Sequence, residues 1–343
     1  MPGDAPILEE FEVSCADPLL RPDTDIYNLE WQWLPCADGN AETRLPKLRT
    51  VALQYVPFKW SSPLIAANLR SISIRSLYNP GIGTLSNTQV TLDRLLHIIS
   101  ANPALEQVTL HFQNAQSNVL PLDSVTLPSL KILNLGGSYQ LITLLEALIT
   151  PSLESLTLSI ERQRSNDTIT NFIARSSYPP ITFLSLSYQN AAVGAYYPND
   201  GDQHLWGFLT ALPHLKTLQI GLASLDSLMD ALSHVDEQSG AWLVPQLKHL
   251  ALRYCNAHGD GILRLISLVE VRNPALTSSG VAQAVGGIGG LTAAFTPAPV
   301  VGTGHPARLK SLELYECASL GDDILKWLKG KIADVKYTEP TSR

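Results

Sequence analysis

The feature that most constrains this chain is a phrase of six residues that recurs along it. The phrase is a leucine, two variable residues, an apolar residue, one variable residue and a second apolar residue. Clear examples are residues 130–135 (LKILNL), 153–158 (LESLTL) and 247–252 (LKHLAL). About eleven copies begin at Leu8, Leu48, Leu69, Leu105, Leu130, Leu153, Ile181, Leu215, Leu247, Leu309 and Ile332. Stacked copies of one unit determine a whole architecture, because each buries its apolar face against its neighbours.

Each phrase predicts a short strand, since its last two apolar residues lie two apart and therefore share one face. Proline, which neither continues a helix nor donates to a ladder, separates helix from strand. It stands two residues before six of the opening leucines: Pro46, Pro103, Pro128, Pro151, Pro213 and Pro245. Apolar residues at helical spacing predict helices between the phrases. These cover residues 92–99 (with Thr91 as N-cap), 141–149, 168–174, 203–212, 225–234, 261–271 and 324–328.

Alternating strands and helices favour an α/β fold with a parallel sheet. We predict a leucine-rich-repeat solenoid over residues 1–343 as a single domain of about eleven repeats. Its form would be an irregular horseshoe, with parallel strands on the concave face and helices on the convex face. The phrases lie mostly 21 to 40 residues apart, and the largest gap runs from Leu247 to Leu309. Within that gap, residues 273–305 read as a flexible insertion rich in Gly, Ala and Pro.

The amino-acid composition limits which partners, and which cellular compartment, we expect for this chain. The formal net charge of −7, without a run of Lys or Arg, argues against nucleic acid as a partner. Residues 280–304 carry no charge, but their glycines and two prolines make a poor spanning helix, so we expect no membrane association. The N-terminus has no signal-peptide pattern. We therefore expect a cytoplasmic or nuclear protein.

Four cysteines, Cys15, Cys36, Cys255 and Cys317, lie in no CxxC or Cys/His metal spacing. Cys255 and Cys317 occupy the same place in their repeats, just after the strand phrase. A small buried thiol suits that position. Reduced cysteines also fit the cytosol or nucleus.

No constellation of catalytic, cofactor-binding or metal-ligating residues stands out. The eight histidines are scattered without metal-type spacing, and no G-x-S-x-G or phosphate loop occurs. Residues 286–290 (GGIGG) are glycine-rich, but no strand precedes them and no Lys-Ser/Thr follows. We predict a non-enzymatic protein with no cofactor.

The remaining candidate is the concave face of the sheet, which would bind a protein partner. Its predicted exposed side chains are mainly small and polar: Ser71, Ser73, Arg75, Gln107, Thr109, His111, Ser155, Thr157, Ser159, Ser185 and Ser187. The C-terminal strands differ, because they carry charged and aromatic residues: His249 and Arg253 on one phrase, and Glu313 and Tyr315 on the neighbouring phrase. Arg and aromatic residues are enriched among the anchors of protein interfaces. These four residues are the predicted partner-binding site.

The chain resembles the leucine-rich region of the F-box protein families of mushroom-forming fungi. The matching stretches are residues 91–96 leading to 102–110, 150–158, 172–177 running into 184–186, and 209–218. This resemblance implies a substrate receptor of a cullin ubiquitin ligase, whose repeats choose the protein to be ubiquitinated. The F-box itself, a short N-terminal helical module, docks such proteins on the ligase adaptor.

The sequence departs from that pattern at its N-terminus. Leu45-Pro46-Lys47-Leu48 mimics the start of an F-box, but we assign this stretch to the strand phrase that follows. The phrase at Leu8 also leaves little room for the polar cap that a terminal repeat needs. Two explanations are open: another chain supplies the cap, or an N-terminal domain has been lost. We favour the loss of an N-terminal domain. A stand-alone scaffold or inhibitor-like regulator without a ubiquitin connection is the alternative function.

Overall fold

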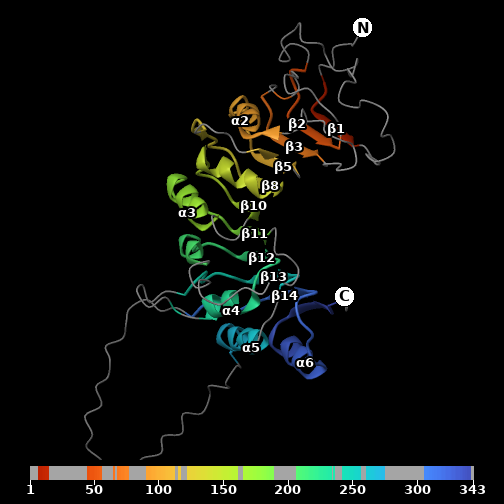
Figure 1. The fold of residues 1–343 in the computed structure, drawn as a ribbon, viewed down its shortest axis with the longest axis vertical. Coiled ribbons are helices and arrows are strands. Elements are labelled where there is room, and N and C mark those ends of the chain that lie inside the picture. Colours follow the sequence, from red (N-terminus) through yellow and green to blue (C-terminus); the bar gives the residue numbers. More distant parts are fainter. Residues whose placement is uncertain are drawn as a thin grey trace, which may run out of the picture.

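The structure is a computed structural model. It describes residues 7–14, 45–55, 65, 68–76, 90–112, 115–116, 122–160, 165–188, 206–233, 235, 242–255, 260–274 and 305–340. Its centre is a parallel sheet of eleven strands whose spatial order follows the chain (Figure 1). The strands are β1 (Glu10–Ser14), β2 (Thr50–Gln54), β3 (Ser71–Ser76), β5 (Gln107–Phe112), β8 (Ile132–Gly137), β10 (Ser155–Ile160), β11 (Phe183–Tyr188), β12 (Thr217–Gly221), β13 (His249–Arg253), β14 (Ser311–Tyr315) and β15 (Asp334–Thr338). Each begins two residues after the start of a phrase, so the predicted strands are confirmed.

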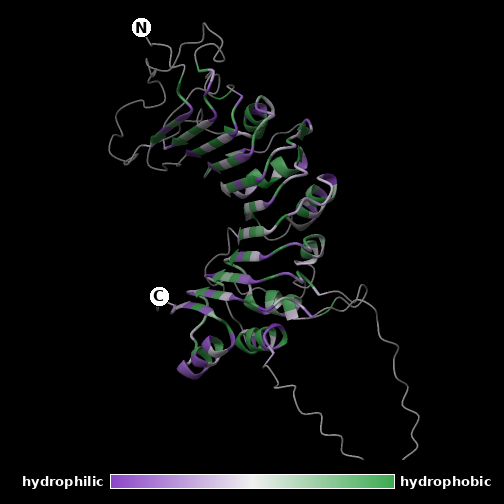
Figure 2. Ribbon diagram, turned by 180° about the vertical axis from the view of Figure 1, so that it is seen from behind, coloured by the Kyte–Doolittle hydropathy of each residue, from purple (hydrophilic) through white to green (hydrophobic). Residues whose placement is uncertain are grey.

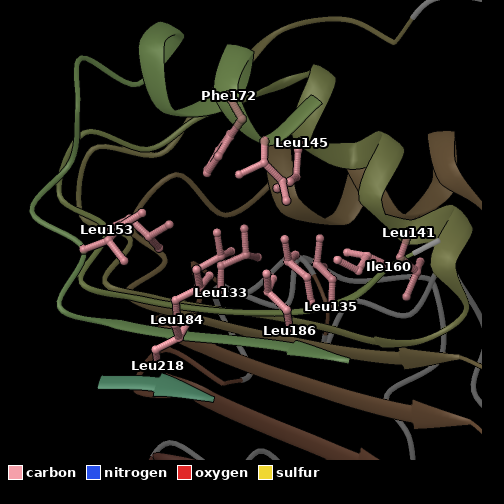
Figure 3. Close-up of a cluster of buried hydrophobic side chains, with 14 of the residues drawn as sticks. Leu133, Leu135, Leu141, Leu145, Leu153, Ile160, Phe172, Leu184, Leu186 and Leu218 are labelled. Carbon is pink, nitrogen blue, oxygen red and sulfur yellow. The ribbon is translucent and has the colours of Figure 1, made fainter. Parts of the chain in front are cut away.

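The register aligns equivalent residues of the phrase into rows across the sheet. Leu156 in β10 pairs with Leu133 in β8 and with Leu184 in β11, and all three are fully buried. Figure 3 shows such rows pointing from the strands toward the helices, where they meet Leu145 and Phe172. Apolar rows of this kind form one continuous core, because every repeat covers the leucines of the next.

Helices lie on the outer side of the arc that the strands follow in Figure 1. The α-helices are α2 (Leu92–Ser100), α3 (Ser165–Arg175), α4 (Leu225–Ser233), α5 (Gly261–Arg272) and α6 (Asp322–Lys331). The prediction of an α/β fold with a parallel sheet is therefore confirmed, and its stacked, curved form is solenoid-like. No helix in the described ranges has the length and apolar character needed to cross a bilayer.

For two of the predicted helices, the described residues form a short 3₁₀-helix and not an α-helix. Residues 141–149 do not form one α-helix, because the 3₁₀-helix η3 (Tyr139–Glu146) ends first and Leu148–Ile149 forms strand β9. This repeat has only 23 residues between phrase starts. A 3₁₀-helix rises about 2 Å per residue against about 1.5 Å in an α-helix. Repeat length alone does not select it, because the 23-residue repeat from Leu309 to Ile332 contains the α-helix α6. In the predicted helix 203–212, the structure describes only the 3₁₀-helix η5 (Gly207–Ala211).

Two short strand pairs on the outer side of the sheet were not predicted from the sequence. β4 (Val90–Thr91) pairs with β6 (Ala115–Gln116), and β7 (Val125–Thr126) pairs with β9. Thr91 occupies the N-cap position of α2, as predicted, but its side chain makes no cap hydrogen bond.

The end of α5 fixes the entries of β13 and β14. The buried Arg272 guanidinium donates to the carbonyls of Leu243 (2.9 Å) and Val244 (3.3 Å), just before the β13 phrase. Burial lowers the pKa of Arg272 to about 10, so it remains charged at neutral pH. Asn273 accepts from the Leu309 amide (2.8 Å) and donates to the Leu309 carbonyl (2.9 Å). Adjacent residues of one helix end therefore hold two successive strands in place.

Asn273 also corrects the start of the predicted insertion at 273–305. Its side chain is 2% exposed and bonded across the repeat, so it belongs to the core and not to the insertion. Residues 275–304 lie outside the described residues, as do residues 1–6, on which the predicted absence of an N-terminal cap depends.

Candidate partner-binding site on the concave face

The four residues predicted to bind a partner lie together on β13 and β14. These parallel strands align His249 with Ser311 and Arg253 with Tyr315. The intervening leucines of both strands are buried in the core, so the alternate side chains face the concave side. Figure 2 shows this alternation as bands of hydrophilic and hydrophobic colour across the strands.

An ion pair links the two strands diagonally across this face. Arg253 Nη2 lies 3.1 Å from Glu313 Oε1, and the side chains keep 51% and 33% of their exposure. A pair this exposed contributes less than about 1 kcal/mol to folding. The charges are therefore held in a defined geometry while they remain open to a partner. Beside them, His249 Nδ1 lies 2.8 Å from Ser311 Oγ.

Two tyrosines form the aromatic part of the site. The rings of Tyr254 and Tyr315 meet edge to face, with centroids 5.2 Å apart and an interplanar angle of 77°. Such pairs have preferred geometry and stabilise each other beyond their buried area. The hydrogen bond with Tyr254 raises the pKa of Tyr315, which favours a neutral phenol. Tyr254 is 42% exposed, so the pair presents aromatic surface to solvent.

Sequence reasoning missed Tyr254 and its neighbour Leu222. Both lie seven residues after a phrase start, in the left-handed region, with φ of 53° and 60°. The Leu222 amide donates to the Arg253 carbonyl (2.9 Å), and the Tyr254 amide donates to that of Tyr315 (2.8 Å). A turn at one fixed offset therefore places 39%-exposed Leu222 beside Tyr254 at the strand ends. Their shared position, seven residues after a phrase start, was the sequence feature from which Tyr254 and Leu222 could have been found.

We call Leu222, Arg253, Tyr254, Glu313 and Tyr315 the C-terminal cluster. It combines an aliphatic side chain, two aromatic rings and both signs of charge on three adjacent strands and the turns that follow them. The middle of the concave face, from β8 to β12, is different because its outward positions hold no charged residue. They are Ile132, Asn134, Gly136, Ser155, Thr157, Ser159, Phe183, Ser185, Ser187, Thr217, Gln219 and Gly221.

A smaller basic pair lies on β3 and β5. Arg75 and His111 are register partners on the concave face. The His111 ring covers Gly136, where an added Cβ would lie 2.7 Å from His111 Nδ1. Burial, and secondly the charge of Arg75, lower the pKa of His111, which favours the neutral imidazole at pH 7. This pair lacks the exposed aromatic surface of the C-terminal cluster.

The cysteine prediction is partly confirmed. Cys255 is 1% exposed, but Cys317 is only partly buried; both are free thiols. Cys15 and Cys36 lie outside the described residues. Within the ranges that the structure describes, no group of three His, Cys, Asp or Glu side chains could hold a metal ion.

In comparisons with known proteins, no protein-family model matches this chain and no curated protein matches it.

Proposed function

We propose that this chain is a leucine-rich-repeat interaction scaffold that binds a protein partner through the C-terminal cluster. The observation that carries the proposal is the edge-to-face pair of Tyr254 and Tyr315 beside the exposed Arg253–Glu313 ion pair. Tyr and Arg are the residues most enriched among interface hot spots. Tyrosine is well suited to this role because it gives a large contact area for few rotatable bonds.

The leucine-rich-repeat part of the proposal is supported by the repeat pattern. Eleven phrases precede eleven parallel strands by the same offset, and the units between them range from 3₁₀-helices to α-helices. Irregular connections around a regular strand phrase suit a solenoid whose sheet determines the stacking. Because repeat solenoids commonly use their concave surface for binding, the cluster lies where a partner is expected.

We further propose that the partner is a protein selected for ubiquitination, with the chain acting as the recognition part of an F-box-type receptor in the cytoplasm or nucleus. This step rests on the resemblance of the repeats to fungal F-box proteins. A stand-alone scaffold or inhibitor-like regulator remains the alternative. The two differ in one observable, which is whether the ligase adaptor and cullin accompany the protein.

The test is affinity purification of the tagged chain, expressed from its native locus, followed by mass spectrometry. The Y254A/Y315A double variant should reduce recovery of the principal partner at least about tenfold, since loss of one hot-spot anchor costs roughly 2 kcal/mol. Tyr178→Ala is the matched control, because Tyr178, like Tyr254, is an exposed tyrosine with positive φ (65% exposed) but lies between α3 and β11. Recovery should be unchanged in that control.

Equal recovery with the wild type and the double variant would refute the C-terminal cluster as the binding site, provided that thermal unfolding shows both to be folded. Adaptor and cullin among the recovered proteins would support the ubiquitin-ligase role. A cluster-dependent partner recovered without them would support the stand-alone scaffold.

A further inference from the structure

The two described cysteines lie beside each other directly beneath the C-terminal cluster. Cys255 and Cys317 each follow their strand by two residues, and the last residues of those strands, Arg253 and Tyr315, are register partners. The Cys255 amide lies 3.5 Å from Cys317 Sγ. Adjacent strands run about 4.8 Å apart, and a disulfide needs Cα atoms about 4.4 to 6.8 Å apart. The fold thus brings together two thiols that are 62 residues apart in the sequence.

The surroundings give the two thiols different chemistry. The hydrogen bond from Cys255 lowers the pKa of Cys317, and the same bond, followed by burial, raises the pKa of Cys255. Cys317 is also the more exposed of the two. A thiol with low pKa and solvent access, poised beside a second cysteine, is the arrangement found in redox-sensing sites. Cys317 therefore suits the attacking role and Cys255 the resolving role.

We propose that Cys255 and Cys317 form a reversible disulfide, which makes the C-terminal cluster sensitive to oxidation by peroxide. In the first step the Cys317 thiolate attacks hydrogen peroxide, giving a sulfenic acid and releasing hydroxide. The Cys255 thiol then loses its proton as its sulfur attacks the sulfenic sulfur, forming the S–S bond; that proton and the sulfenic hydroxyl leave together as water. Each disulfide consumes one peroxide, and a dithiol reductant restores both thiols.

The bond would act on the cluster through the backbone. Tyr254 lies between the end of β13 and Cys255, and Glu316 lies between the end of β14 and Cys317. Both turn residues have positive φ, 53° and 47°. A covalent bond between the next residues would restrain these turns and shift the Tyr254–Tyr315 pair. We expect the oxidised chain to retain its partner several-fold less well. This effect rests on the proposed function, whereas the disulfide does not.

The experiment treats the purified full chain with hydrogen peroxide and maps its peptides by mass spectrometry without reduction. A crosslinked Cys255–Cys317 peptide, two hydrogens lighter than the separate peptides and cleaved by dithiothreitol, is expected. It should persist in the C15S/C36S variant, which removes the other two thiols. A Cys317 that stops at a sulfinic acid, or a disulfide that forms only with Cys15 or Cys36, would overturn the proposal.

Two single variants test the roles of the thiols. In Cys255→Ser, dimedone should trap a sulfenic acid on Cys317, whereas Cys317→Ser should leave Cys255 unlabelled. Labelling of Cys255 alone would reverse the assignment and so contradict it. Partner retention by reduced and oxidised wild type then separates the two claims. A disulfide without any change in retention refutes the regulation and leaves the bond standing.

Discussion

Replacing Leu156 with Asp should lower the free energy of unfolding by roughly 4 kcal/mol, because the substitution buries an unpaired carboxylate. Leu156 is the second residue of β10 and is fully buried, as are its register partners Leu133 and Leu184. The core offers only apolar side chains along this row, so the carboxyl group would lose its water without gaining a partner. Urea unfolding followed by circular dichroism measures the change.

The matched control is Thr157→Asp, one residue further along the same strand. Thr157 is partly exposed on the concave face between Asn134 and Ser185. A carboxylate there keeps its hydration, so the expected loss is below about 1 kcal/mol. Similar losses for the two variants would show that the inward and outward assignments of this strand are wrong.

Replacing Asn102 with Ala should cost about 3 kcal/mol, because each broken hydrogen bond contributes about 1 kcal/mol and its buried partners stay unpaired. Asn102 is fully buried after α2. Its side chain accepts from the Leu69 amide (2.8 Å) and donates to the carbonyls of Ile65 (2.5 Å) and Ile98 (2.8 Å). These bonds join a helix end to the preceding repeat, so their loss weakens the stacking of two units.

Ser100→Ala provides the control for that variant. Ser100 Oγ donates to the His97 carbonyl (2.9 Å) at an exposed position, where water replaces the lost bond. The expected change is within about 0.5 kcal/mol. Equal midpoints for N102A and the wild type in denaturant unfolding would rule out a structural role for the buried amide.

The strands could be predicted from the sequence, because the phrase shows both where each strand begins and which of its side chains point into the core. Leu133 and Leu135, two residues apart, identify β8 and its inward side without reference to any other part of the chain. The outer elements were less predictable, since helical spacing does not separate an α-helix from the 3₁₀-helix η3. The number of residues between phrases does not separate the two types either, because the 23-residue repeats that begin at Leu130 and Leu309 contain η3 and the α-helix α6, respectively.

The candidate site was predictable only in part. Alternation along β13 and β14 placed Arg253 and Tyr315 on the concave face. Tyr254 was missed because a left-handed residue after the strand breaks the alternation. The contact between Cys255 and Cys317 depends on the register of strands on either side of the longest gap. The phrases at Leu247 and Leu309 place the two cysteines at the same offset, but their contact also depends on the turns at Tyr254 and Glu316, whose positive φ the phrase does not predict.

The most direct test of the binding site is photo-crosslinking in the native cells. A photoreactive phenylalanine analogue replaces Tyr254 in one protein and Tyr178 in another, and irradiation precedes purification under denaturing conditions. Because both positions are exposed, only the position in contact with a partner should form a discrete adduct. We expect an adduct from position 254 and none from position 178. Adducts from position 178 alone, or none from either, would contradict binding at the C-terminal cluster.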